Sequence, residues 1–180
     1  MAVDGARRPY WKDTAAFCKK HGVRVAIEMH PNFVVYHPES MLRLADVARG
    51  TIGCNFDPSH MFWQQVDVPT AIRALGELIF HVHAKDCKID RQNTALNGVL
   101  DTKKYTEEIK RSWIFRTVGY GNPEGVWRDL VSNLRLVGYD HVISIEHEDS
   151  LMTGDEGLKK AIEVLRNVVI SAPAGAAYWA

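Results

Sequence analysis

The chain contains four short apolar runs, and each one ends in polar or ionisable residues. They are "VRVAIEMHP" at residues 23–31, "GTIGCNFDPSH" at 50–60, "LIFHVHAKD" at 78–86 and "HVISIEHED" at 141–149. Runs of this length that are rich in β-branched residues and bounded by turn residues are typical of strands buried on both faces. The pattern therefore predicts four buried strands.

Amphipathic segments precede, separate and follow these strands, and they are typical of helices. They cover residues 10–22, 37–50, 67–77, 122–140 and 153–169. Proline near the start and glycine just past the end, as at Pro38 and Gly50, is the usual asymmetry of a helix. Buried strands joined by helical crossovers form a parallel sheet. We therefore predict an α/β fold in a single domain spanning residues 1–180.

One segment breaks this alternation of helix and strand. Residues 87–123 are polar and contain several glycine and asparagine residues. Long connections of this kind are more often lids or binding loops than filler. We therefore expect a loop that covers a site.

Ionisable residues gather at the carboxyl end of every predicted strand. In chain order, the ends carry Glu28 and His30; Asp57 and His60; His81, His83, Lys85 and Asp86; and Glu146, His147 and Glu148. Parallel α/β sheets bind their ligands at this edge. Because side chains alternate along a strand, residues two apart, such as His81 and His83, share one face. If these faces line one cleft, several carboxylates and one or two imidazoles meet there.

Such a cluster needs compensating positive charge. Buried carboxylates repel each other strongly unless a cation or protons neutralise them. Oxygen and nitrogen donors without thiolate suit Mn²⁺, Mg²⁺, Co²⁺ or Zn²⁺. We therefore predict one divalent metal ion as the cofactor. The alternative is a set of ordinary ion pairs at the rim of the sheet.

The composition narrows the classes of partner. The chain has 180 residues, 46% of them hydrophobic, and its 22 basic residues balance 22 acidic ones. That balance argues against nucleic acid and anionic membranes as partners, and no stretch is apolar enough to span a bilayer. The N-terminus lacks the apolar core of a signal peptide, and the three scattered cysteines are typical of reduced thiols. We expect a cytoplasmic protein with a small-molecule substrate.

The motifs "IEMHP", "NFDPSH", "HVHAKD" and "SIEHED", in this order and at this spacing, resemble the xylose isomerase-like TIM barrels of the sugar phosphate isomerases and epimerases. The resemblance implies a (β/α)8 barrel that holds one divalent ion through its last four strands. The matching positions for these metal ligands are Glu28, Asp57, His83 and Glu146. It is open whether His30, His81 or Glu148 replaces one of them.

The resemblance also implies residues that bind the substrate. His60 matches a substrate-contacting position of the epimerases, and Lys85 and His30 are further candidates for holding substrate hydroxyls or a negative group. The epimerases place a substrate-binding arginine six residues after the third ligand, where this chain has Ile89. This difference weighs against a free ketohexose as the substrate.

The predicted strands are too few for a closed barrel. A barrel of this kind has eight strands and about 250 residues, whereas this chain has four strands that correspond to the second half, the half with every metal ligand. Half a barrel leaves two open sheet edges. We therefore expect a fragment, a homo-oligomer in which two copies pair, or a chain that joins a separate first half-barrel.

The resulting hypothesis is a divalent-metal-dependent isomerase or epimerase acting on a small polyhydroxylated carbonyl compound, a sugar or a sugar phosphate. The catalytic residues would be Glu28 and Glu146, which remove and return the α-proton through an enediolate. Two alternatives stay open. One is a metal-dependent hydrolase of the endonuclease IV type, which uses three zinc ions, and the other is a non-catalytic half-barrel that needs a partner.

Overall fold

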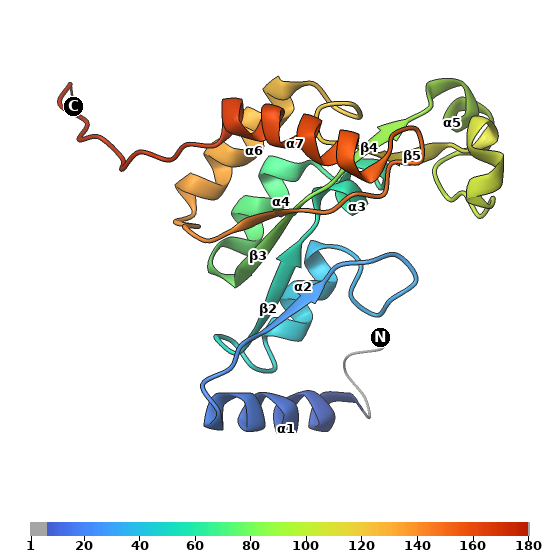
Figure 1. The fold of residues 1–180 in the computed structure, drawn as a ribbon. Coiled ribbons are helices and arrows are strands. Elements are labelled where there is room, and N and C mark those ends of the chain that lie inside the picture. Colours follow the sequence, from blue (N-terminus) through green and yellow to red (C-terminus); the bar gives the residue numbers. More distant parts are fainter. Residues whose placement is uncertain (1–6, 180) are drawn as a thin grey trace.

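The computed structural model of the protein describes residues 7–179 and contains a four-stranded parallel sheet (Figure 1). Its strand order is β1-β2-β3-β6, with β1 at Val25–Glu28, β2 at Ile52–Phe56, β3 at Ile79–Ala84 and β6 at Ile143–Ile145. All neighbouring strands run parallel. Each strand lies within one of the four apolar runs, which confirms the predicted α/β fold with a parallel sheet and a partial barrel.

Five helices occupy the segments where helices were predicted. They are α1 at Arg7–Lys20, α2 at Pro38–Ala45, α4 at Val68–Leu75, α6 at Glu124–Leu136 and α7 at Gly154–Val168. Side chains just before several helices cap their free N–H groups. Asp67 accepts a hydrogen bond from the Thr70 backbone N–H before α4, and Thr153 accepts one from Glu156 before α7. The local sequence therefore fixes where these helices begin.

A further short helix, α3 at Pro58–Trp63, follows β2 directly and was not predicted as a helix. Asp57 ends the strand and caps the helix, because its Oδ1 accepts the Ser59 backbone N–H at 2.8 Å. Proline at the first helical position favours this start. The turn carries His60 back over the end of β2, where its Nε2 lies 3.6 Å from Asp57 Oδ2.

The two faces of the sheet bury different kinds of side chain. Ile52, Cys54 and Phe56 alternate along β2 and are fully buried beneath α2, α4 and α6. The helices contribute apolar side chains such as Leu44, Ile72 and Trp127 to this core. Because side chains alternate along a strand, the opposite face of the same strands carries the polar residues of the predicted site.

The segment at residues 87–123 contains regular structure, so the prediction of a plain loop is wrong there. A two-stranded antiparallel sheet pairs β4 (Asp86–Ile89) with β5 (Trp113–Arg116), and α5 (Arg91–Asn97) and η2 (Tyr105–Lys110) lie between them. Cys87, Trp113 and Phe115 face one side of this pair and pack with Trp63 of α3 in a second apolar cluster. Only Lys85 separates β4 from β3, and the predicted strand run at 78–86 ended where β4 begins, so the rest of β4 was assigned to the loop.

The carboxylate of Asp86, which is fully buried, ties this small sheet to α6. It accepts six hydrogen bonds of 2.7 to 3.2 Å from the backbone N–H groups of Cys87, Gly119, Gly121 and Asn122 and from Asn122 Nδ2 and Trp127 Nε1. Burial raises the pKa of Asp86, whereas the six donors, with no acceptor among them, favour its anionic form. The chain before α6 is thereby wrapped around the end of the third strand.

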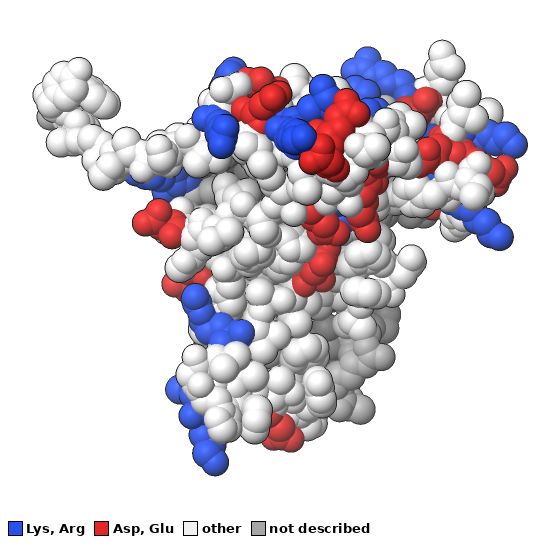
Figure 2. All heavy atoms as spheres, viewed as in Figure 1, with Lys and Arg blue, Asp and Glu red and all other residues white. Residues whose placement is uncertain are grey.

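The charges on the visible surface are mixed. In the face drawn in Figure 2, lysine and arginine side chains alternate with acidic ones over α7, and they form no continuous basic surface on the described residues of that face. Lys159 pairs with Asp155 at 2.6 Å and Lys160 with Glu156 at 3.8 Å, both one helical turn apart. Exposed pairs of this kind contribute little to stability.

We expect Gly121→Ala to lower the free energy of unfolding by about 2 kcal/mol, because a methyl group must be forced into a filled site. A Cβ atom at Gly121 would lie 2.6 Å from both Asp86 Oδ1 and the Cys87 carbonyl oxygen. The matched control is Gly125→Ala in α6, where a Cβ atom meets nothing within 4 Å and stability should stay equal or rise. Urea unfolding of both variants checks this, and equal stabilities would contradict it.

Candidate metal centre

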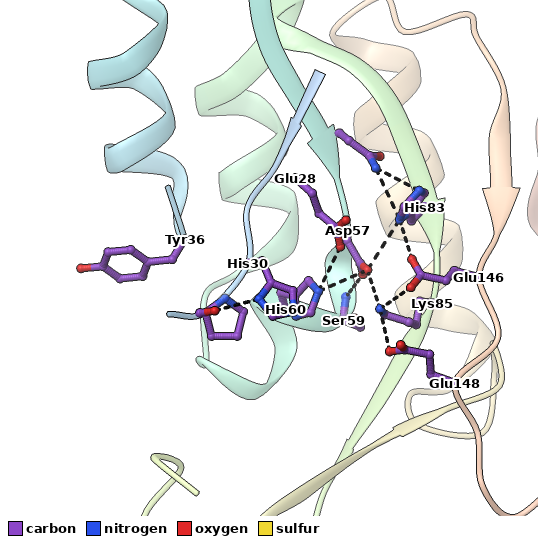
Figure 3. Close-up of polar contacts among 12 residues, drawn as sticks. Glu28, His30, Tyr36, Asp57, Ser59, His60, His83, Lys85, Glu146 and Glu148 are labelled. Atoms are coloured by element: carbon purple, nitrogen blue, oxygen red, sulfur yellow. Dashed lines mark hydrogen bonds and ion pairs between the residues drawn. The ribbon is translucent and has the colours of Figure 1, made fainter. Parts of the chain in front are cut away.

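Four side chains converge at the carboxyl edge of the sheet (Figure 3). Glu28 is the last residue of β1, His83 lies near the end of β3, and Asp57 and Glu146 directly follow β2 and β6. One ligand atom from each of the four lies within 4.8 Å of all the others. The Asp57 side chain is fully buried, whereas those of Glu28, His83 and Glu146 are between 21% and 32% exposed. The cluster is therefore anchored in the fold and open on one side.

The imidazole of His83 lies between two of the carboxylates. Its Nδ1 is 3.8 Å from Asp57 Oδ2 and 2.7 Å from Glu146 Oε2. Hydrogen bonding to Asp57 and Glu146 raises the pKa of His83 to about 9. The hydrogen bond from His83, together with Lys85, lowers the pKa of Glu146 to about 2 although partial burial opposes this. His83 is therefore an imidazolium at neutral pH in the metal-free protein.

Lys85 supplies a second cation from the same strand end. Its Nζ lies 3.2 Å from Asp57 Oδ2, 2.9 Å from Glu146 Oε1 and 3.0 Å from Glu148 Oε2, and the side chain is 3% exposed. Burial by itself would lower the pKa of Lys85, but these carboxylates outweigh burial and raise it. The ammonium also lies 4.5 Å from the centre of the Phe115 ring. Lys85 is thus a fixed positive charge inside the cluster.

The charges and donor atoms of the cluster suit a divalent cation. The carboxylates of Glu28, Asp57, Glu146 and Glu148 outnumber the cations Lys85 and His83 by two. Asp57 Oδ2 and Glu146 Oε2 are buried, and the cations of His83 and Lys85 lie beside them. Three carboxylates and one imidazole are ligands that Mn²⁺, Co²⁺ and Zn²⁺ accept. The residues present therefore fit a metal ion.

His60 and His30 flank the cluster. His60 is fully buried, and its Nε2 lies 3.2 Å from Glu28 Oε1. The His30 ring packs against the His60 ring with 4.5 Å between centroids, and its Nδ1 is 2.7 Å from the Pro31 carbonyl oxygen. His60 therefore touches a proposed ligand directly, whereas His30 reaches the cluster only through His60.

Other polar residues at the strand ends have different partners. His81 Nε2 is 2.6 Å from Ser144 Oγ, and Glu148 pairs with Lys85, so neither belongs to the group of four converging atoms. The structure also brings in Asn55, which the sequence interpretation missed and whose Nδ2 is 2.9 Å from His83 Nε2. Its position two residues before Asp57 could have identified it from the sequence, because residues two apart on a strand share a face. Ile89 packs in the apolar cluster with Trp113.

A partial parallel barrel with acids and histidines at the carboxyl edge defines an α/β-barrel protein. A family model described as "Xylose isomerase-like TIM barrel" matches residues 8–168, and the chain therefore belongs to this family. Members of the family include sugar isomerases and epimerases, which are enzymes. No helix of the described residues combines the length and apolar character needed to cross a membrane.

The chain aligns with about half the length of its relatives. It is 36% identical over 162 residues to the uncharacterised protein YfiH of Bacillus subtilis, covering 89% of this chain and 52% of YfiH. The crystal structure of the IOLI protein with a bound zinc atom superposes with a TM-score of 0.65 at 19% identity, covering 91% of this chain and 55% of that one. An L-ribulose 3-epimerase gives a TM-score of 0.54 at 21% identity, with 91% and 47% covered. The chain thus spans about half the length of these proteins.

Metal binding should strengthen as the pH rises toward 9. Below that pH the His83 imidazole carries a proton that a metal ion must displace, since its pKa is raised to about 9. Displacement of one proton predicts up to about a tenfold gain in Mn²⁺ affinity per pH unit. Titration of free Mn²⁺ by electron paramagnetic resonance at several pH values measures this. His141→Gln, a change at an exposed histidine, is the control that should keep the slope, and a flat profile would contradict the prediction.

Proposed function

We propose that the chain carries the centre of a divalent-metal-dependent isomerase or epimerase for a small polyhydroxylated carbonyl compound, a sugar or a sugar phosphate. The observation that carries this proposal is the convergence of Glu28, Asp57, His83 and Glu146 within 4.8 Å. These four residues would hold the ion. When bound, the ion would polarise the substrate carbonyl and an adjacent hydroxyl group.

The two partly exposed glutamates are placed for proton transfer. Glu28 comes from β1 and Glu146 from the end of β6, the two outer strands of the sheet, so they stand on opposite sides of the cluster (Figure 3). One carboxylate would take the proton next to the carbonyl group and leave an enediolate. In an isomerisation the same residue, now a carboxylic acid, would return the proton to the next carbon; in an epimerisation the other glutamate would first take a proton from solvent and then give it to the opposite face. Their exposure of about one third leaves room for a substrate.

The neighbouring cations and imidazoles orient these glutamates and the substrate. Lys85 holds Glu146 Oε1 at 2.9 Å, and His60 holds Glu28 Oε1 at 3.2 Å, so each proposed base has one oxygen fixed. His60 and Lys85 are buried, so in this proposal they act on the substrate through the glutamates that they hold, and His30 would support His60 from behind. The Phe115 ring closes one side of the cluster, 5.5 Å from the His60 ring.

The catalytic unit proposed here is a complete barrel. The described sheet has two outer strands, β1 and β6, and eight strands close a barrel of this kind. A first half-barrel, or a second copy in a homo-oligomer, would cover these edges and the inner face of the sheet. The relatives, about twice as long as this chain, support the first of these arrangements.

The metal content of the purified protein tests the ligand set. We expect about one equivalent of Mn²⁺ or Zn²⁺ per chain after dialysis, because four ligands serve one ion. The double variant His83→Ala, Glu146→Gln should lose the ion, whereas Glu124→Gln, at an exposed helix pair with Arg128, should retain it. If the unmodified protein binds no metal, the proposal is wrong. Three zinc ions per chain would favour the hydrolase alternative instead.

Deuterium exchange tests the reaction class directly. In D₂O the protein with bound Mn²⁺ should exchange the proton next to the carbonyl group of ketoses or hydroxyaldehydes, which proton NMR follows. We expect His60→Gln to slow exchange by about 10²-fold, because the proposed base Glu28 loses its partner. Metal bound without exchange for any substrate, by the chain alone or with its first half-barrel, would count against an isomerase.

A further inference from the structure

We infer that the Lys85 ammonium occupies the place of a second metal ion and thereby limits the proposed centre to one divalent ion. This inference rests on the proposed metal centre and adds the number of ions that the centre holds. Lys85 is a positioning residue in this role, because it binds carboxylates and not the substrate. The number of ions separates the proposed isomerase from the hydrolase alternative, which needs three.

The Lys85 ammonium is surrounded as a bound cation would be. Lys85 directly follows β3, two residues after His83, so the two side chains point to the same face. Its Nζ lies within 3.2 Å of one carboxylate oxygen each from Asp57, Glu146 and Glu148 (Figure 3). An ammonium group has three donors, and three anionic oxygens lie within reach of them. The fold has therefore built a binding site for a cation and filled it with its own side chain.

The position of the ammonium leaves no room for a metal ion beside it. The Lys85 side chain is 3% exposed, and the centre of the Phe115 ring lies 4.5 Å from Nζ. A Mn²⁺ ion needs a full shell of ligands or water molecules, so it cannot bind among these oxygens while Nζ lies there. The Glu148 side chain is half-exposed, so an ion from solvent could reach the same oxygens if the ammonium were removed.

Glu146 connects this position to the proposed metal ion. Its Oε2 lies 2.7 Å from Nδ1 of the proposed ligand His83, whereas its Oε1 lies 2.9 Å from Lys85 Nζ. One carboxylate thus presents one oxygen to each of two cation positions. In enzymes with two metal ions the ions lie about 3.5–4 Å apart, close enough for one carboxylate to contact both. Lys85 therefore stands where the second ion of such a pair would bind.

The charge balance of the cluster leads to the same conclusion. The cluster has four carboxylates, those of Glu28, Asp57, Glu146 and Glu148. One divalent ion and Lys85 supply three positive charges, since a coordinated imidazole is neutral. Without Lys85 one ion supplies only two, and the remaining negative charge attracts a second ion. The lysine thus takes the place of an ion that these carboxylates would otherwise bind.

Counting the ions at saturating Mn²⁺ by native mass spectrometry tests the inference. We expect one Mn²⁺ ion per chain in the unmodified protein and two in Lys85→Ala. Adding Glu148→Gln to Lys85→Ala should return the count to one, because Glu148 contacts Lys85 but is not among the four converging ligands. Lys103→Ala is the matched control and should keep one ion, since Lys103 pairs with a single carboxylate, that of Asp101.

Electron paramagnetic resonance reports where the added ion binds. Two Mn²⁺ ions about 3.5–4 Å apart are magnetically coupled, so Lys85→Ala should give the spectrum of a coupled pair and the unmodified protein that of an isolated ion. A purely structural role of Lys85 would produce neither the second ion nor the coupling. One ion or none in Lys85→Ala beside one in the unmodified protein would overturn the inference, and so would a second ion without coupling or more than one ion in the unmodified protein.

The same counts separate this inference from the proposed function. If the unmodified protein holds no ion and Lys85→Ala holds one, Lys85 does occupy the place of an ion, and the proposed one-ion centre is wrong. If neither protein holds an ion, both the inference and the proposed centre are wrong. Circular dichroism checks that Lys85→Ala is folded. If it is not, Lys85→Met, which keeps the apolar stem of the side chain, takes its place in both measurements.

Discussion

The buried carboxylate of Asp86 is the interaction on which the arrangement of the site depends. It follows Lys85 directly and lies three residues after His83, so the six N–H groups that hold it also fix the strand end that carries both cations. The same bonds attach the segment before α6, through Gly121, and the Trp127 indole of α6 itself. Loss of this carboxylate would leave several buried donors unpaired, each at a cost of about 1–3 kcal/mol.

The carboxylates that converge at this strand end repel each other, so their negative charge must be compensated by cations. Lys85 and His83 both pair with Glu146, each with a different carboxylate oxygen. Nζ of Lys85 lies closest to Oε1, and Nδ1 of His83 faces Oε2. A metal ion can replace the proton on His83 while Lys85 stays in place, because only the imidazole has a pKa that the ion can overcome near neutral pH. The lysine therefore preorganises the cluster without blocking it.

The sequence allowed the sheet and the converging residues to be predicted, because both follow from simple periodicities. Four apolar runs with polar ends imply four parallel strands, and a parallel sheet brings those ends to one edge. The strands β4 and β5 were missed because β4 continues β3 after a single residue and its partner lies far along the chain. Asn55 was missed for another reason: its position two residues before Asp57 places it on the same face, but an uncharged amide is not one of the ionisable residues by which the strand ends were recognised.

In the proposed function, the residues for metal binding and those for substrate choice lie on different parts of this chain. The proposed ligands all follow from strand ends, whose motifs identify the family. The surroundings of a substrate would depend instead on residues 86–116, where Phe115 lies beside Lys85, and Tyr105 stacks on Phe115 at 6.2 Å. At Ile89 this segment packs a partly buried apolar side chain where the resemblance implied a substrate-binding arginine. Under the proposed function, the ligand motifs would define the class of chemistry, and residues 86–116, together with a first half-barrel, would determine which substrate is bound.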